Sequence, residues 1–365
     1  MRAAVLKKAP GKLEIEQVKT TPVGPQEVLV RLAASGLCHS DLHYIEGKYD
    51  VAMWGGFPAI LGHEAAGIVE EVGDNVAGFK KGDHVIACSS IYCGRCRQCI
   101  SGNPALCENK QSLQRAPTER RRLESLDGKP ISQFGNISGF AECILVHQNA
   151  LVKIVDEMPL DRAAIIGCGV STGLGAVFRT ARVEPGSTVA VIGCGGIGLN
   201  TIQGARLAGA ANIIAIDTLD LKLEAARKFG ATEVVNASKV DPVKEVIRIT
   251  NGGVDYSFEA IGLKKTAEQA FQMLRKGATA TIIGMVPRDQ KIELDGFELL
   301  SERKIQGSIM GSIRFPIDIP AYVTMYLQGR LKLDELITGR IALDQINEGY
   351  AELKAGKAIR TIIVF

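Results

Sequence analysis

Four cysteines, Cys93, Cys96, Cys99 and Cys107, lie within fifteen residues of this chain. The spacing C-x2-C-x2-C-x7-C brings four thiolates together, and four thiolates complete the tetrahedral coordination of Zn²⁺ with no position left for water. We therefore predict a structural zinc that holds this loop. A pair of disulfides is the alternative, but the count of nine cysteines is odd and residues 1–12 contain no apolar secretion segment. Thiols in a reducing compartment favour metal over cystine. A cytoplasmic location is the default expectation.

The length of 365 residues exceeds what a single core usually supports and predicts two domains. Hydrophobic residues make up 46% and charged residues 23%, which is typical of a folded globular protein. The net charge of +3 gives no reason to expect a nucleic-acid partner. A zinc-ribbon module that binds nucleic acid is a further alternative, but the chain is not basic enough and lacks interleaved aromatic residues. No uncharged apolar run of 18 residues is present, so we expect no membrane span.

The pattern of predicted secondary structure changes near residue 168. Before it, short runs of strand-forming residues are separated by Gly and Pro and predict a β-rich, barrel-like domain, with strands at residues 3–6, 13–17, 27–33, 66–72, 84–88 and 141–146. After it, apolar strands alternate with helical segments and predict a parallel α/β sheet, with strands at 188–192, 212–216, 233–235, 255–258 and 279–283. A helix at 319–328 and a strand at 359–365 suggest a return to the first domain.

A glycine-rich turn follows the strand predicted at 188–192. Its sequence G-x-G-x-x-G begins at Gly193, where a tight turn is needed, and continues to Gly195, which lets the backbone approach a pyrophosphate, and Gly198, which lets helix and strand pack closely. Asp217 ends the next strand, placed to accept hydrogen bonds from an adenosine ribose and to repel a 2′-phosphate. We predict NAD(H) binding rather than NADP(H); a glycine turn without a ligand is the alternative.

A second metal site is suggested by three residues far apart in the chain, Cys38, His63 and Cys168. Two thiolates, one imidazole and an open fourth position make a catalytic zinc site that polarises an alcohol oxygen. Spacing alone does not establish this site, because isolated cysteines are often buried core residues and an isolated histidine is often structural.

The chain resembles the zinc-dependent alcohol dehydrogenases of the medium-chain dehydrogenase/reductase superfamily. The resemblance runs almost end to end through five motifs in unbroken order: GLCHSDLH at 36–43, GHEAAG at 62–67, the four-cysteine loop, GCGVSTG at 167–173 and the Gly193 loop. It implies a GroES-like catalytic domain at 1–167, completed by 311–365, and a Rossmann NAD-binding domain at 168–310, with the active site between them. It also implies two zinc ions per subunit, with ligands Cys38, His63 and Cys168 for the catalytic ion and the four loop cysteines for the structural ion.

The resemblance further assigns roles to residues around the catalytic zinc. Ser40 matches the hydroxyl that accepts the alcohol's proton, and His43 matches the imidazole that passes the proton to solvent. Asp41 matches a carboxylate that orients His63. Glu64 matches the acid beside the metal, with a salt bridge under the zinc as the alternative role.

Cofactor contacts are implied at a larger set of positions. On the resemblance, His39 and Arg360 lie near the pyrophosphate, Thr172 near the nicotinamide and Lys222 near the adenosine ribose. The remaining expected contacts are Gly193, Gly195, Gly196, Ile197, Gly198, Asp217, Ile261 and Met285. For Lys222 and Arg360 a solvated charge is the alternative.

The implied reaction is the reversible NAD-linked oxidation of a primary alcohol, and Ser89, small where several relatives have an aromatic residue, suggests a bulky, aromatic or medium-chain substrate. Trp54, the only tryptophan, either lines that pocket or packs under the loop. The run Arg120 to Arg122 is expected to be a solvated loop face; it would otherwise attract an acidic thiol adduct, as in formaldehyde dehydrogenases. A nicotinoprotein with tightly bound NAD and a silent NAD-binding protein are further alternatives. The expected partner is a second copy of the chain, in a homodimer or homotetramer.

Overall fold

The computed structural model describes residues 1–116 and 118–365, which divide into two compact units. Unit 1 is Met1–Cys168 with Arg314–Phe365, and unit 2 is Gly169–Ile313. Both divisions fall within a few residues of the domain boundaries expected from the sequence. They leave Cys168 in the same unit as Cys38 and His63.

Unit 1 contains a small closed barrel and a larger sheet. The barrel strands run in the order β1 (Arg2–Leu6), β2 (Leu13–Thr20), β7 (Leu123–Ser125), β8 (Pro130–Gln133) and β4 (Ala59–Ile60). The sheet runs in the order β10 (Leu151–Lys153), β6 (His84–Ala87), β5 (Glu64–Val72), β3 (Glu27–Gly36), β18 (Arg360–Val364) and β17 (Ile337–Ile341), with β9 (Cys143–His147) paired to β3. The predicted β-rich character of this region is confirmed, although the short strands β7, β8 and β10 carried no clear sequence signal.

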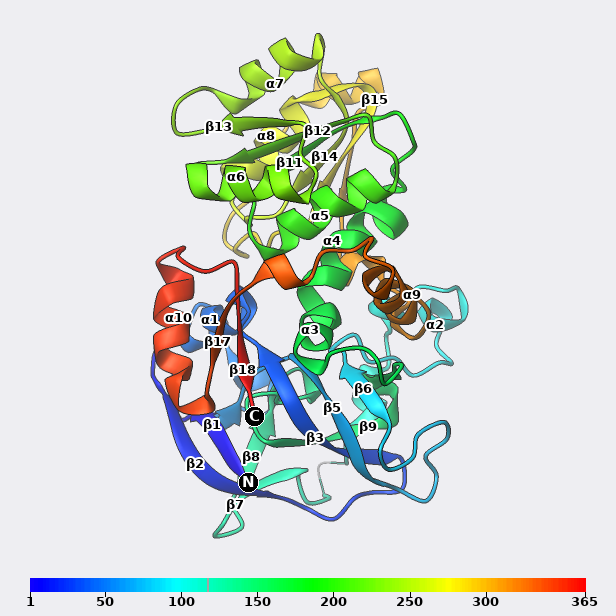
Figure 1. Ribbon diagram of the computed structural model, residues 1–365, viewed down its shortest axis with the longest axis vertical. Helices are drawn as coiled ribbons and strands as arrows, with labels where there is room; N and C mark the ends of the chain where they lie inside the picture. The colour runs from blue at the N-terminus through cyan, green and yellow to red at the C-terminus, as the bar shows by residue number, and fades with distance from the viewer. Residues whose placement is uncertain (117) are drawn as a thin grey trace. The chain divides into compact units, whose positions relative to one another are not determined.

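The C-terminal strand β18 completes the sheet of unit 1. It pairs antiparallel with β3, so that Ile363 lies opposite Ser35, and Figure 1 shows the two strands side by side with both chain ends in this unit. The helices of unit 1 are α1 (His39–Ile45), α2 (Arg97–Ile100), α3 (Leu160–Ile165), α9 (Phe315–Leu327) and α10 (Ile346–Lys354). The C-terminal segment therefore belongs to the fold of the N-terminal segment.

Unit 2 is a parallel six-stranded sheet with the strand order 3-2-1-4-5-6 of a Rossmann fold. The strands are β13 (Glu233–Asn236), β12 (Asn212–Asp217), β11 (Thr188–Ile192), β14 (Val254–Glu259), β15 (Leu274–Ile282) and β16 (Lys304–Gly307). The helices are α4 (Ser171–Gly175), α5 (Gly196–Leu207), α6 (Asp220–Phe229), α7 (Pro242–Thr250) and α8 (Lys264–Gln272). All five residues of β11 are buried, as expected for a central strand covered on both faces. The predicted α/β class is confirmed.

One helical stretch, Leu160–Ala181, is long and apolar enough to cross a membrane by length and composition alone. In its most apolar window, 83% of the residues are buried inside the protein. That burial is typical of a core helix, so this stretch is weak evidence for a membrane span.

Candidate metal centres and cofactor loop

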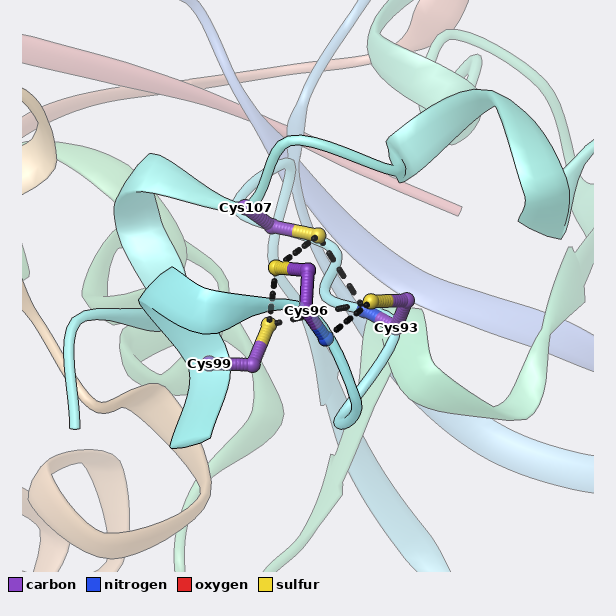
Figure 2. Close-up of side chains that lie close together, drawn as sticks. All are labelled: Cys93, Cys96, Cys99 and Cys107. Atoms are coloured by element: carbon purple, nitrogen blue, oxygen red, sulfur yellow. Dashed lines mark hydrogen bonds between the residues drawn. The ribbon is translucent and has the colours of Figure 1, made fainter. Parts of the chain in front are cut away.

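The four loop cysteines converge on one point (Figure 2). Their sulfur atoms are separated by 3.5 Å between Cys96 and Cys99, 3.9 Å between Cys96 and Cys107, and 4.0 Å between Cys93 and Cys99. Zn–S bonds of about 2.3 Å in a tetrahedron place sulfur atoms about 3.8 Å apart, whereas a disulfide needs about 2.0 Å. The loop therefore fits a tetrahedral metal ion, and all nine cysteines are unpaired.

Backbone amides prepare this loop for a cation. The Cys93 N–H donates to the Cys107 sulfur and the Cys96 N–H donates to the Cys93 sulfur, each at 3.3 Å. Amides of Glu108 and Cys99 lower the pKa of the Cys96 thiol to about 6. Because thiolates are the metal-binding form of cysteine, these contacts favour the ligating state.

A second cluster in unit 1 joins Cys38, His63, Glu64 and Cys168. One donor atom from each lies within 4.8 Å of all the others, and all four residues are buried. Cys38 precedes helix α1, His63 and Glu64 stand at the start of β5, and Cys168 lies in the π-helical turn Ile166–Val170. Turns of this kind are frequent at functional sites. The fold thus gathers donors that are 130 residues apart in the chain.

The position of Asp41 fixes the imidazole of His63. Its Oδ1 accepts a hydrogen bond from the Gly62 N–H at 3.0 Å and lies 3.1 Å from His63 Nδ1. With Nδ1 held by a carboxylate, Nε2 is the nitrogen left to bind a metal. Burial lowers the pKa of His63, but the charges of Asp41 and Cys38 outweigh it and raise the pKa well above its ordinary value.

Thiol chemistry in the cluster also suits a cation. A hydrogen bond from Cys168, with support from His63, holds the pKa of Cys38 well below its ordinary value against the effect of burial. A set of two sulfurs, one imidazole and one carboxylate is typical of zinc ligation. The donor set therefore fits a zinc ion held by Cys38, His63 and Cys168, with Glu64 beside it.

Glu64 forms a buried ion pair with Arg360. Arg360 Nη2 lies 3.1 Å from Glu64 Oε1, and its Nη1 donates to the Leu37 carbonyl oxygen. Burial raises the pKa of Glu64 to about 7, although the Arg360 charge opposes this shift. Arg360 is only 4% exposed, so it is not a solvated charge.

Helix α1 carries three more of the predicted residues. His39 is exposed, while Ser40 and His43 are partly buried. Burial and the Lys48 charge lower the pKa of His43, which favours the neutral imidazole that can accept a proton. The rings of His43 and Tyr49 form a T-shaped pair with centroids 5.7 Å apart.

The glycine turn of unit 2 has the geometry expected of a dinucleotide loop. Gly193 has a φ of +95°, and a Cβ on Gly198 would lie 1.7 Å from the Gly193 carbonyl oxygen, so only glycine fits there. A Cβ on Gly195 would meet nothing within 4 Å, which leaves its backbone open to a ligand. Gly196 and Ile197 begin helix α5, whose free N–H groups favour a phosphate.

Asp217 is held at the end of β12 by backbone donors. Its Oδ2 accepts from the Cys194 N–H at 2.8 Å, and its Oδ1 accepts from the Thr218 and Leu219 N–H groups. Asp217 is 8% exposed. The carboxylate is thus fixed directly beside the glycine turn.

Other predicted cofactor residues of unit 2 lie on neighbouring segments. Ile261 packs over the turn, because a Cβ on Gly193 would lie 2.6 Å from its Cγ1. The backbone of Met285 borders Gly262, and Met285 is 44% exposed. Lys222 lies on α6, and Thr172 lies on α4 with its Oγ1 3.8 Å from the Met310 sulfur.

The expectation of a fully solvated arginine run is wrong for Arg122. That residue is 7% exposed and donates to Glu27 Oε1 at 2.7 Å, and Arg115 donates to both oxygens of the same carboxylate. Arg120 pairs with Glu124, whereas Arg121 is exposed. Burial raises the pKa of Glu27, but the two arginines outweigh it and lower the pKa to about 2.

Phe134 is a residue that the sequence did not indicate. It lies on a short 3-10 turn, and its ring centroid is 5.9 Å from that of His63 and 5.6 Å from that of Trp54. Next to it, Gly135 faces His63 and Ser89, whose Cβ atoms would be 3.5 Å and 3.6 Å from a Cβ at this position. An isolated phenylalanine on an irregular turn gives no local signal.

Comparison with known proteins agrees with this architecture. A family model described as an alcohol dehydrogenase GroES-like domain matches residues 24–156, and one described as a zinc-binding dehydrogenase matches residues 196–327. A class-3 alcohol dehydrogenase of Cereibacter sphaeroides is 38% identical, over 100% of this chain and 99% of that protein. A geraniol dehydrogenase of Carpoglyphus lactis is also 38% identical, over 100% of this chain and 97% of that protein.

Solved structures give the same result. The crystal structure of a benzyl alcohol dehydrogenase from Acinetobacter calcoaceticus has a TM-score of 0.93 and 32% identity, and covers 100% of this chain and 99% of that chain. The crystal structure of a protein described as a zinc-binding dehydrogenase from Sinorhizobium meliloti, bound to NADP, has a TM-score of 0.83 and 28% identity. It covers 100% of this chain and 99% of that chain. The fold and sites thus define a two-domain, metal- and nucleotide-dependent oxidoreductase. The chain belongs to the zinc-dependent alcohol dehydrogenases of the medium-chain dehydrogenase/reductase superfamily.

Proposed function

We propose that this protein catalyses the reversible NAD-linked oxidation of a primary alcohol to its aldehyde at a zinc ion held by Cys38, His63 and Cys168. The observation that carries the proposal is the buried cluster of these donors within 4.8 Å of one another, in a chain of the alcohol dehydrogenase family. A zinc ion bound there would lower the pKa of the alcohol and stabilise negative charge on its oxygen.

The residues around the cluster have complementary tasks in this proposal. Asp41 orients His63 through Nδ1 and increases its basicity as a ligand. Ser40 accepts the alcohol's proton and His43, neutral because of its lowered pKa, passes it to solvent. Arg360 neutralises the negative charge of Glu64 beside the metal ligands. It also contacts the pyrophosphate of the cofactor in this proposal.

The cofactor in this proposal is NAD rather than NADP. Asp217 supports it, because a buried carboxylate fixed by three backbone amides cannot move away from a 2′-phosphate. A second, structural zinc ion held by the four loop cysteines completes the metal content at two per subunit; the 3.5 to 4.0 Å sulfur spacing supports it.

The proposed substrate is a bulky primary alcohol of the aromatic or terpenoid kind. Gly135 and Ser89 are both small and lie next to each other, and Gly135 lies beside His63, so no large side chain occupies this position. Two relatives, named geraniol dehydrogenase and benzyl alcohol dehydrogenase, support this size class. The thiol-adduct alternative is less favoured, because Glu27 and Glu124 already pair with Arg122 and Arg120.

A second copy of the chain is the proposed partner, and the cytoplasm the proposed location. In the part of the chain that the structure describes, the outer edge of β16 pairs with no strand, and the neighbouring Phe297 and Leu300 are 76% and 77% exposed. Unpaired edges and exposed apolar residues favour association. Light scattering on the purified protein tests for a dimer or tetramer.

The deciding experiment measures NADH absorbance from zinc-replete protein with free NAD and a panel of alcohols from ethanol to octanol, benzyl alcohol and geraniol. We expect the rate to depend on added NAD and to be highest for the larger alcohols. Ser89→Phe should selectively reduce kcat/KM for benzyl alcohol and geraniol, with ethanol as the internal control. Turnover only with an artificial acceptor would favour a nicotinoprotein, and no turnover at all would refute the proposal.

A further inference from the structure

Strand β14 of unit 2 ends at Glu259, a fully buried glutamate. In the sheet it pairs with Ile192 of β11 on one side and Ile282 of β15 on the other. β11 and β14 are the neighbouring strands at which the strand order 3-2-1-4-5-6 reverses. Ligands of such sheets bind at the carboxyl ends of the strands, at this reversal. Glu259 therefore lies at the expected cofactor crevice, beside the residue that leads into the Gly193 turn.

One oxygen of the Glu259 carboxylate holds the turn that follows the strand. Oε1 accepts hydrogen bonds from the N–H groups of Ile261 at 2.9 Å and Gly262 at 2.8 Å, and from the Thr266 hydroxyl at 2.8 Å. An ionised carboxylate accepts hydrogen bonds and donates none, so three donors on one oxygen match its charged form. These bonds fix the turn 260–262, on which Ile261 packs over Gly193.

The other oxygen of this carboxylate faces a second segment of unit 2. A Cβ on Gly284 would lie 2.5 Å from Glu259 Oε2, so the absence of a side chain there leaves room for the carboxylate. The Gly284 N–H donates to the main-chain oxygen of Glu259 at 3.0 Å. A Cβ on Gly262 would lie 2.7 Å from the Met285 nitrogen, so the two segments are in close contact. Glu259 thus joins the segments that carry Ile261 and Met285.

The charge of Glu259 is not cancelled by a counter-ion. In the part of the chain that the structure describes, no basic side chain forms an ion pair with Glu259, and its Oε2 has no hydrogen-bond partner. Burial of an unpaired charge is costly, and such a group calls for an explanation. Since buried surroundings screen charge weakly, Glu259 makes this end of the sheet negative.

The position of Asp217 indicates which half of the cofactor meets this charge. Asp217 ends β12, in the half of the sheet formed by β11, β12 and β13, and is expected to bind the adenosine ribose. A dinucleotide lies across both halves of a Rossmann sheet, so the nicotinamide belongs to the half that begins with β14. The nicotinamide ring is a cation in NAD⁺ and neutral in NADH. A negative charge nearby therefore favours the oxidised ring.

We propose that Glu259 sets the preference between oxidised and reduced cofactor: it fixes the turn 260–262, and its negative charge favours NAD⁺ over NADH. This proposal rests on the proposed use of a nicotinamide cofactor, but not on the oxidation of any alcohol. Weaker binding of NADH relative to NAD⁺ assists alcohol oxidation, because NADH has to leave at the end of each turnover. Binding itself can be measured without turnover.

Glu259→Gln tests the role of the charge. This variant keeps the length of the side chain and an acceptor oxygen but removes the negative charge. Isothermal titration calorimetry of the zinc-replete protein, without alcohol, gives the Kd for NAD⁺ and, separately, for NADH. We expect the ratio of the NAD⁺ Kd to the NADH Kd to rise roughly fivefold or more. A residue that only shaped the turn would change both Kd values by the same factor.

Thr266→Val tests the same idea with the opposite sign. It removes one hydrogen-bond donor from Glu259 Oε1 and keeps the volume of the side chain, so the carboxylate charge is less compensated. We expect the ratio of Kd values to fall below that of the unmodified protein. Glu233→Gln is the matched control, because Glu233 is an exposed glutamate at the start of β13, at the opposite end of the strands. Its ratio should equal that of the unmodified protein.

An unchanged ratio in Glu259→Gln, or the same change in Glu233→Gln, would overturn the proposal. If Glu259→Gln does not fold, Thr266→Val decides, and a ratio equal to or above that of the unmodified protein overturns the proposal. If the unmodified protein binds neither NAD⁺ nor NADH, the proposed NAD preference is refuted, and the ratio for NADP⁺ and NADPH tests Glu259 in the same way. Binding of neither pair would refute both proposals. Normal cofactor binding without turnover of any alcohol would refute the proposed reaction alone.

Discussion

The four-cysteine loop and the buried cluster around Cys38 gather similar donor atoms by opposite routes. The loop takes its four sulfurs from fifteen consecutive residues, and backbone N–H groups of the loop itself support them. The cluster takes its donors from Cys38 just before α1, from His63 and Glu64 at the start of β5, and from the turn at Cys168, and its position depends on the sheet that β18 joins. A closed local loop is suited to holding structure, whereas a cluster fixed by the whole unit can leave one coordination position for a substrate.

Loss of a cluster ligand should have the largest effect on activity. Cys168→Ala removes one of the proposed ligands, and we expect kcat/KM for the best alcohol to fall by a factor of roughly 10³ or more, because stabilisation of the alcohol oxygen is lost. Steady-state NADH formation measures the loss of activity. Metal analysis should find one zinc ion per chain, the one held by the four loop cysteines. Cys143→Ala, a half-buried cysteine outside both sets, is the control. Near-normal activity of Cys168→Ala would end the assignment of this cluster as the catalytic centre.

Loss of a loop ligand should act on stability instead. Cys96→Ala leaves three thiolates in a loop with few other buried contacts, and we expect the free energy of unfolding to fall by about 4 kcal/mol, in the range of mutations that remove a metal. Denaturant unfolding and limited proteolysis near residues 93–107 report the change. Cys194→Ala, buried in unit 2, serves as the comparison. If the loop variant kept both zinc ions and resisted protease, a structural metal there would be refuted.

The segment that follows the loop is held by a long-range contact that is sensitive to pH. Glu27 has its pKa lowered to about 2 by Arg115 and Arg122, against an ordinary value of 4.5. A lowered pKa stabilises the folded state above the unfolded value, and the stabilisation is lost as pH falls from about 5 toward 2. The shift corresponds to about 3 kcal/mol near neutral pH.

Glu27→Gln measures this contribution. The difference in unfolding free energy between Glu27→Gln and the unmodified protein should be nearly constant from pH 7 to about pH 5 and should become smaller from pH 5 to pH 4. Urea unfolding at several pH values records it, with Glu71→Gln, an exposed glutamate of the same unit, as the reference. A difference independent of pH would show that packing, not charge, holds Glu27.

The same contrast explains which parts of the molecule could be predicted from sequence. The four-cysteine loop and the strand at 188–192 could be predicted, because each has its signal in consecutive or closely spaced residues. The loop has four cysteines close together, and the strand is a short apolar run whose five residues are all buried in the structure. Helix α9 begins at Phe315, before the expected start at residue 319, because Pro316 is tolerated in a first helical turn. The burial of Arg122 could not be predicted from the sequence, because its partner Glu27 lies 95 residues away in the chain. The trio Cys38, His63 and Cys168 needed the family resemblance.

The smallest expected effect concerns the hydrogen bond between Asp41 and the ligand His63. Asp41→Asn keeps an oxygen that can accept from the Gly62 N–H and from His63 Nδ1, but removes the negative charge. Since such outer carboxylates orient a ligating histidine and increase its basicity, we expect zinc affinity to fall by roughly 10–100-fold with the fold intact. Competition with a chelator measures the affinity, and Asp50→Asn, at an exposed turn, is the control. The four-cysteine zinc should be unaffected in Asp41→Asn. Equal loss of both zinc ions would show that Asp41 supports unit 1 as a whole rather than the catalytic ligand.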